Sequence, residues 1–315
     1  MSKRLFCPAC GEIPWDIKIY AVVAPWVREL SGNRDKKTLY FVCSKCKTGW
    51  ADIFYSNHEM QNLYQDYRGV NYLRVRSKWE STYSTNFNSS IDSGDSHLNL
   101  RRSQMEEIID TNFYSFISTT NSVLDIGGGH GGLMPNWPGI LSKYVLDISG
   151  AETEVGIKSV RSWNEISVSR PFDLIMICGI LEHLTQPFKF LEETKINLSN
   201  LNLATVETLF YFEVPGGVPS RKKMFLKFIW AFLFSLSPYF WNRYDKIINR
   251  KGINNYPLRI AEHIQFFTPL GLRKLLESNG FEVIDQSEFD VKESLVDSNS
   301  VRFSKVINMI AKLVK

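Results

Sequence analysis

Short apolar runs alternate with helical patterns from about residue 100 onward. Each apolar run has the length of a buried strand, and each helical pattern has apolar residues three or four positions apart. The runs expected as strands are 122–126, 144–147, 172–178, 203–213 and 281–285, and the segments expected as helices are 100–115, 188–198 and 269–278, the last ended by Asn279 and Gly280. This alternation predicts an α/β fold with a doubly wound, Rossmann-like sheet.

A polar stretch at 84–97 (STNFNSSIDSGDSH) separates this pattern from the first part of the chain. Its composition is typical of a joint between domains. We therefore expect a small module and a larger α/β domain. The expected division is 1–60 as a metal-binding module, 61–104 as a helical linker, 105–290 as the α/β domain with an apolar insertion at 216–258, and 291–315 as an amphipathic helix.

Two segments raise the question of membrane contact. The apolar run at 224–241 is shorter than the roughly 20 residues of a spanning helix, so we expect a buried or lid helix, with a patch resting on a membrane surface as the alternative. The final segment places six apolar residues on one helical face with lysines opposite. Those residues are Phe303, Val306, Ile307, Ile310, Leu313 and Val314. This pattern predicts a docking helix, and a basic membrane-surface helix is the alternative.

Composition and charge narrow the class of protein. The 315 residues are 44% hydrophobic, as expected of a packed chain, and the net charge of +4 disfavours a dedicated nucleic-acid binder without excluding a local basic patch. The first residues contain no apolar stretch followed by a cleavage site. We therefore expect a cytoplasmic protein, with peripheral membrane association through 224–241 as the alternative.

Four of the five cysteines form two Cys-x-x-Cys pairs. Cys7 and Cys10 make the first pair and Cys43 and Cys46 the second, separated by 32 residues. Two such pairs supply four thiolates, a complete tetrahedral set that leaves no position for a catalytic water. The pattern predicts one structural Zn²⁺; a redox dithiol and unliganded thiols are the alternatives.

The most informative motif is the glycine-rich segment 123–132 (VLDIGGGHGG). Glycines after a strand let the backbone pass close beneath a ligand. No Gly-Lys-Ser/Thr follows, which excludes a P-loop. Asp125 stands before the first glycine, where a carboxylate suits a ligand with a cationic amino group. The next strand ends in Asp147, a position from which a carboxylate can bind ribose hydroxyls.

This motif pair resembles that of class I S-adenosylmethionine-dependent methyltransferases. The resemblance implies that Asp125, Gly127, Gly129 and Gly131 cradle the amino acid part of the cofactor. It implies that Asp147 binds ribose and that Ile148 lies beside it.

The resemblance extends over residues 105–290, and within this family the chain is similar to the ubiquinone-methyltransferase-like branch. It rests on 171–187 (PFDLIMICGILEHLTQP), on Glu213-Val-Pro, and on 263–269 (HIQFFTP) with 275–283. The resemblance also implies that Cys178 packs against the bound cofactor. One departure is that 156–163 (GIKSVRSW) lacks the acid that often binds adenine; backbone near 161–162 and packing by Trp163 would then hold the base.

The candidate catalytic residues are Glu182, His183 and His263. Each is expected near the carboxyl ends of the strands, and imidazole is suited to accept a proton near neutral pH. Structural or cofactor-wall roles are the alternatives. Tyr67, Arg68, Tyr72 and Arg76 come just before the joint, where the arginines either clamp an anion or form a solvated helix face.

A zinc ribbon before a methyltransferase domain resembles two groups of enzymes. One is sugar C-methyltransferases and related enzymes of surface polysaccharides, and the other is ribosomal RNA guanine methyltransferases. The four cysteines and the Tyr-Arg segment resemble the first group more closely, although the further carboxyl-terminal domain of the sugar C-methyltransferases is missing, which leaves O-methylation open. We therefore expect a sugar or glycan acceptor; an RNA base methyltransferase and a non-catalytic cofactor-binding or zinc-scaffold protein are the alternatives.

Overall fold

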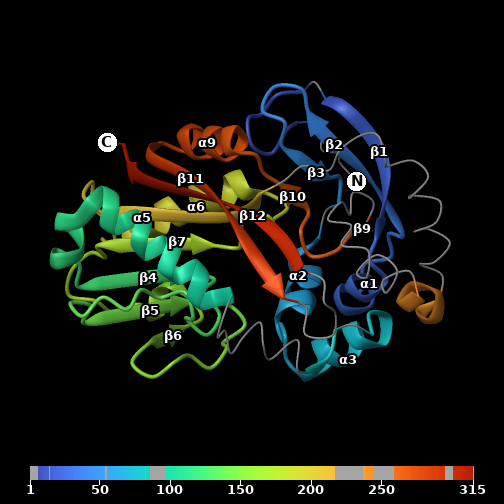
Figure 1. The fold of residues 1–315 in the computed structure, drawn as a ribbon, viewed down its shortest axis with the longest axis horizontal. Coiled ribbons are helices and arrows are strands. Elements are labelled where there is room, and N and C mark those ends of the chain that lie inside the picture. The colour runs from blue at the N-terminus through green and yellow to red at the C-terminus, as the bar shows by residue number, and fades with distance from the viewer. Residues whose placement is uncertain are drawn as a thin grey trace.

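The computed structural model describes residues 6–13, 15–53, 55–81, 83–85, 97–216, 237–243, 259–294 and 301–314. These residues build two β-sheets with helices around them (Figure 1). The larger sheet has seven strands in the order β11-β12-β8-β7-β4-β5-β6, and the smaller has five in the order β10-β3-β2-β1-β9.

The larger sheet is doubly wound, as the alternating pattern predicts. Its strands are β4 (Ser122–Ile126), β5 (Ser142–Leu146), β6 (Lys158–Val160), β7 (Leu174–Cys178), β8 (Leu209–Gly216), β11 (Phe281–Ser294) and β12 (Val301–Leu313). The first five run parallel, and β12 is antiparallel to both of its neighbours. The chain leaves β6 at one edge and returns to β7 on the other side of β4. Ligands of such sheets bind at this switch point, outside the carboxyl ends of the strands.

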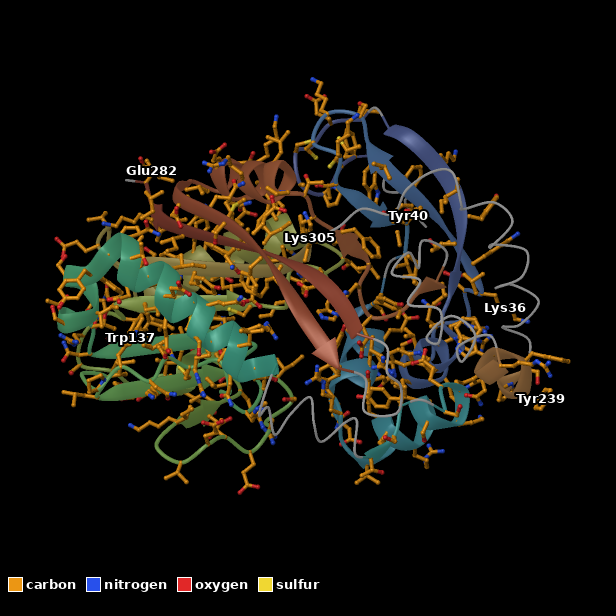
Figure 2. All side chains as sticks on the ribbon, viewed as in Figure 1. Lys36, Tyr40, Trp137, Tyr239, Glu282 and Lys305 are labelled. Atoms are coloured by element: carbon orange, nitrogen blue, oxygen red, sulfur yellow. The ribbon has the colours of Figure 1, made fainter. Side chains whose placement is uncertain are left out.

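Three helices cover the two faces of the larger sheet. They are α5 (His97–Thr119), α6 (Pro187–Asn200) and α9 (Pro269–Ser278). Met105 and Ile109 of α5 pack on one face with Val123, whereas Leu191 of α6 and Leu272 of α9 pack on the other with alternate strand residues. Side chains fill the space between α5 and the sheet (Figure 2). Because both faces are covered, β4 and β7 are buried along their whole length.

The expected helix at 291–315 is wrong, because 301–313 form strand β12 between β8 and β11. The run 306–311 (VINMIA) is buried without interruption, since Ile310 faces α5 while Ile307 and Met309 face the opposite core. A strand buried on both faces carries a continuous apolar run, which also satisfies the three-and-four spacing of a helix. Periodicity alone therefore does not separate the two structures in this segment.

The smaller sheet joins the first part of the chain to a segment more than 200 positions later. Strands β1 (Trp15–Val23), β2 (Lys37–Cys43) and β3 (Gly49–Ala51) form its centre. Strands β9 (Arg259–Ile260) and β10 (Gln265–Phe266) pair with β1 and β3 at its edges. Helices α1 (Pro25–Ser31), α2 (Asn57–Tyr64) and α3 (Val70–Trp79) pack beside this sheet. Residues 259–266 thus connect the cysteine-bearing part of the chain to the larger sheet.

Most of the apolar insertion at 216–258, including most of 224–241, lies outside the described residues. Within it, 238–243 are helical, and Trp241 is buried against the core of the smaller sheet. Asn242 bonds to the carbonyl of Lys78 at 3.0 Å, which fixes this piece to the end of α3. Tyr239 projects outward (Figure 2). No helix in the described part of the chain is long and apolar enough to span a bilayer.

Candidate active site

The glycine loop begins directly at the end of β4. Gly127, Gly129 and Gly131 all have positive φ angles, of 72°, 56° and 86°. A Cβ atom at Gly127 would lie 2.2 Å from Ile180 Cδ1, so a side chain there meets both strain and a clash. No helix follows within 127–141, where the glycines together with Pro135 and Pro138 oppose one. The loop therefore presents backbone and not a helix N-terminus to the switch point.

Asp125 is fully buried beneath this loop. Neither of its carboxylate oxygens has a hydrogen-bond partner within the described chain. Burial, followed by the nearby charge of Asp147, raises the pKa of Asp125 to about 8. A buried carboxylate without a partner is costly, and a cationic group placed beside it would remove that cost.

Asp147 lies just past β5 and connects the glycine loop after β4 to the turn after β5. Its Oδ2 accepts a hydrogen bond from the Gly129 N–H at 2.9 Å, and its Oδ1 accepts one from the Ser149 N–H at 2.8 Å. Ile148 beside it is 67% exposed. The acid expected to bind ribose thus lies against the glycine loop, with an exposed apolar side chain next to it.

The segment after β6 contains a carboxylate, Glu165, that the sequence did not predict as part of the site. Glu165 accepts hydrogen bonds from the Ser162 hydroxyl at 2.6 Å and from the Arg161 N–H at 3.2 Å. It lies two residues beyond the segment 156–163, and the Ser162-x-x-Glu165 spacing was the available signal. Trp163 packs partly against the core on the α6 and α9 side of the sheet.

The carboxyl ends of β7 and β8 carry a buried polar pair. Cys178 lies opposite Glu213 in the sheet register, and burial raises the pKa of the Cys178 thiol. Glu213 accepts a hydrogen bond from Arg101 Nε at 2.6 Å. Arg101 comes from α5 and was not expected from the sequence, because the contact joins residues 112 positions apart.

Glu182, His183 and His263 lie together, with their possible ligand atoms all within 4.8 Å of one another. The His183 and His263 rings are nearly perpendicular, with centroids 4.7 Å apart. The carbonyl of Glu182 accepts hydrogen bonds from the N–H groups of Ile264 and Gln265 at 2.8 and 2.9 Å, which joins the two segments. Burial lowers the pKa of both histidines, so they are neutral at pH 7, and burial raises the pKa of Glu182 to about 8.

Tyr64 adds a residue from the first part of the chain to this cluster. Its hydroxyl lies 2.9 Å from His183 Nδ1, which also lies 3.2 Å from the carbonyl oxygen of Glu262. The sequence does not indicate this contact, since Tyr64 and His183 are 119 positions apart.

Arg76 is enclosed by aromatic rings and acids. Its guanidinium lies 3.9 Å from the centre of the Tyr83 ring and 4.4 Å from that of Trp26. It also forms ion pairs with Glu80 at 3.0 Å and Glu262 at 3.5 Å. The Glu262 pair fixes the segment that carries His263 to α3. Arg76 therefore positions this segment, and it does not lie on a solvated helix face.

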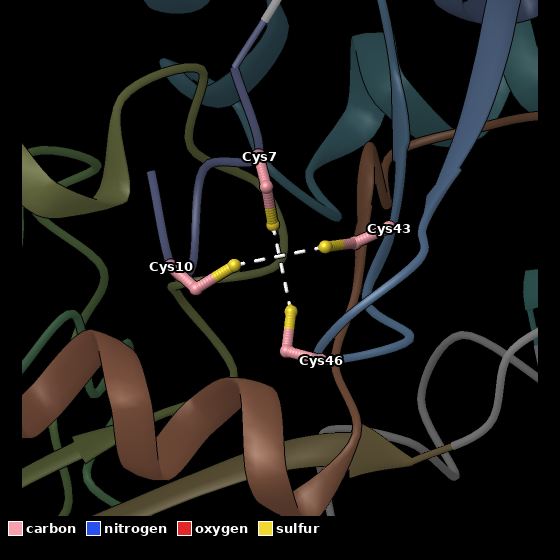
Figure 3. Close-up of side chains that lie close together, drawn as sticks. All are labelled: Cys7, Cys10, Cys43 and Cys46. Carbon is pink, nitrogen blue, oxygen red and sulfur yellow. Dashed lines mark hydrogen bonds between the residues drawn. The ribbon is translucent and has the colours of Figure 1, made fainter. Parts of the chain in front are cut away.

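The four paired cysteines converge on one point (Figure 3). Cys7 Sγ lies 3.5 Å from Cys46 Sγ, and Cys10 Sγ lies 3.6 Å from Cys43 Sγ. Four sulfurs bound tetrahedrally at about 2.3 Å from one Zn²⁺ would lie about 3.8 Å apart, so the set fits a zinc ion. Burial raises the pKa of Cys10 to about 11, and a hydrogen bond from Cys7 lowers that of Cys46 to about 5. The four sulfurs are thus placed where they could hold one cation between them.

The strand order, the antiparallel β12 and the loop of Asp125 and Asp147 together define the class I methyltransferase fold. A family model for a methyltransferase domain matches residues 98–286, more than half of the chain. The chain belongs to this family and is an S-adenosylmethionine-dependent methyltransferase.

The fold is also similar to that of solved methyltransferases at low sequence identity. An S-adenosylmethionine-dependent methyltransferase from Clostridium acetobutylicum is 11% identical, with a TM-score of 0.40, 73% of this chain covered and 97% of that one. The N-methyltransferase NodS from Bradyrhizobium japonicum, solved with S-adenosyl-L-homocysteine, is 12% identical, with a TM-score of 0.38 and coverages of 70% and 90%. Among curated proteins, none matches the chain significantly.

Proposed function

We propose that the protein transfers a methyl group from S-adenosylmethionine to a sugar or glycan acceptor that is nucleotide-linked, lipid-linked or polymeric. The observation that carries the proposal is the polar cluster of Tyr64, Glu182, His183 and His263 at the carboxyl-terminal edge of the larger sheet. A sugar hydroxyl must lose a proton during methylation, and a neutral imidazole is the side chain suited to accept it.

The cofactor site is assigned to the loop between β4 and β5. In this assignment Asp125 receives the cationic amino group, which supplies the partner that its buried oxygens lack. The backbone can approach the ligand because Gly127, Gly129 and Gly131 carry no side chain. The Asp147 carboxylate accepts hydrogen bonds from the ribose hydroxyls. Ile148 and Trp163 are assigned to the adenine side, and Cys178 to the wall beside the methyl group. When bound, the cofactor supplies the electrophilic methyl, so the protein mainly aligns the acceptor.

His183 is the preferred proton acceptor. If its Nδ1–H donates to the Glu262 carbonyl, Nε2 carries the free lone pair, 3.9 Å from Glu182 Oε1. The hydroxyl of Tyr64 lies 2.9 Å from the same Nδ1, so two groups hold this edge of the ring and Nε2 stays available. Glu182 and His263 lie beside the His183 ring and orient the acceptor.

We also propose that Cys7, Cys10, Cys43 and Cys46 hold one structural Zn²⁺. The sulfur spacing supports a tetrahedral ion with no open position. The carbonyl of Cys46 accepts a hydrogen bond from the Thr268 hydroxyl at 2.5 Å, at the N-terminus of α9. The ion would therefore stabilise the contact between the two sheets. Reduced thiols bound to zinc fit a cytoplasmic location.

An acceptor screen tests the proposed activity. The purified protein is supplied with S-adenosylmethionine carrying a labelled methyl group and with nucleotide sugars, glycan fragments or RNA in parallel. We expect label to enter a sugar-containing acceptor, with at least a hundredfold loss in His183→Ala. Methyl uptake by RNA alone would overturn the sugar assignment, and no uptake by any acceptor would favour a non-catalytic protein.

A further inference from the structure

We propose that Glu182, His183 and His263 form a second metal site, which binds a divalent cation such as Mn²⁺, Fe²⁺ or Zn²⁺ beside the acceptor. Two imidazoles and one carboxylate are a ligand set typical of these ions. The site is separate from the four-cysteine cluster and has a different coordination chemistry.

The separation of the three side chains suits a shared ion. Their ligand atoms lie within 4.8 Å of one another, and ligands about 2.1 Å from one ion lie at most about 4.2 Å apart. Side-chain movements of less than about one ångström would therefore close the set around a cation.

The contact on the far side of the His183 ring also favours a metal ligand. Imidazoles that bind metals generally donate their other N–H to a carbonyl or carboxylate. His183 Nδ1 lies 3.2 Å from the Glu262 carbonyl oxygen, and this arrangement directs Nε2 toward Glu182. The Ile264 and Gln265 N–H groups bond to the Glu182 carbonyl, so the two ligand-bearing segments are held together before any ion binds.

The buried carboxylate of Glu182 supplies an independent reason. Its Oε2 is buried and has no hydrogen-bond partner among the described residues. A divalent cation would satisfy this oxygen and balance its charge. Proton acceptance by His183 requires no such partner for Glu182.

Three protein ligands leave coordination positions open, and an oxygen atom of the acceptor can fill one of them. In that state Nε2 of His183 is a ligand and no longer the proton acceptor; the cation makes the coordinated hydroxyl more acidic, and the released proton passes to solvent. This last step rests on the proposed function, whereas the binding of the cation does not.

Manganese titration followed by electron paramagnetic resonance tests the site on the full-length protein. Mn²⁺ binds thiolates weakly, so it leaves zinc in the four-cysteine cluster. We expect one Mn²⁺ per chain, with binding at least tenfold weaker in Glu182→Gln and in His263→Ala. His58→Ala is the control, because this exposed histidine on α2 is outside the cluster and should leave binding unchanged.

Absence of Mn²⁺ binding by the intact protein, or equal binding by the three variants, would overturn the metal site. Circular dichroism of each variant confirms that a loss of binding is not a loss of fold. The acceptor screen is scored separately, so Mn²⁺ binding without methylation of any sugar would contradict the proposed function and leave the metal site supported.

Discussion

Asp125 lies in an unusual environment for a carboxylate, because it is buried and neither oxygen is bonded within the described residues. Its position before the first glycine was predictable, since strand, acid and glycines are adjacent in the chain. The sequence did not predict the contributions of Tyr64, Arg101 and Glu262. Each of them reaches the site through a contact with a residue far away in sequence. The residues proposed to hold the cofactor are thus local in sequence, and those proposed to face the acceptor are brought together by tertiary structure.

The raised pKa of Asp125 predicts a pH dependence of cofactor binding. Below its pKa of about 8 the carboxyl is protonated in the free protein, so binding the cationic amino group must release that proton. We expect affinity to rise on the order of tenfold from pH 6 to pH 7.5. The rise should end near pH 8, where the amino group of the ligand itself loses its proton.

Calorimetry across this pH range, in buffers of different ionisation enthalpy, measures both the affinity and the proton released. Asp125→Asn should bind more weakly and lose the pH dependence. Equal affinity of the intact protein at pH 6 and pH 7.5, with no proton release, would contradict a role for Asp125 at the amino group.

At the scale of elements, the predictions that succeeded concern segments whose sequence pattern suits only a strand or only a helix. The expected segments at 122–126 and 269–278 coincide with β4 and α9, both marked by clear boundaries. The segment 301–313 was ambiguous because its apolar run suits either a helix or a strand buried on both faces. Pairing with β8 and β11 decides the structure, and neither partner is near in sequence.

Ile310 tests the place of β12 inside the sheet. This residue is buried beneath α5, so Ile310→Ala should lower the free energy of unfolding by about 2–5 kcal/mol. Val314→Ala, at a residue that is 60% exposed just past the strand, should change it by less than about 0.5 kcal/mol. Urea denaturation compares the two, and equal small effects would indicate a peripheral segment.

At the scale of the whole molecule, the two sheets are connected through 259–268. Strands β9 and β10 belong to the smaller sheet, His263 between them lies with Glu182 and His183, and the Thr268 hydroxyl donates a hydrogen bond to the Cys46 carbonyl. The convergence of the four cysteines on one point was predictable from their spacing alone. Their connection to the cluster of Glu182, His183 and His263 was not predictable, because it depends on how a distant segment completes the smaller sheet.

Zinc analysis of the purified protein tests the proposed ion, and about one zinc per chain is expected. Cys43→Ser should lose the zinc and lower the melting temperature on the order of 10 °C, because the proposed ion would stabilise the packing between the sheets. Cys178→Ser is the matched control and should retain zinc, since this thiol is at the end of β7 and outside the cluster. Zinc-free wild-type protein with reduced thiols would exclude the structural ion.

The most direct test of the central claim, that the β4 and β5 loop holds S-adenosylmethionine, is calorimetric titration of the cofactor into the intact protein and into Asp147→Ala. Glu152→Ala, at an exposed acid in the same loop region, is the control. We expect one cofactor per chain for wild type and Glu152→Ala, and at least tenfold weaker binding for Asp147→Ala, as its lost hydrogen bonds are each worth about 1–3 kcal/mol. No binding by the intact protein, or unchanged binding by Asp147→Ala, would contradict it.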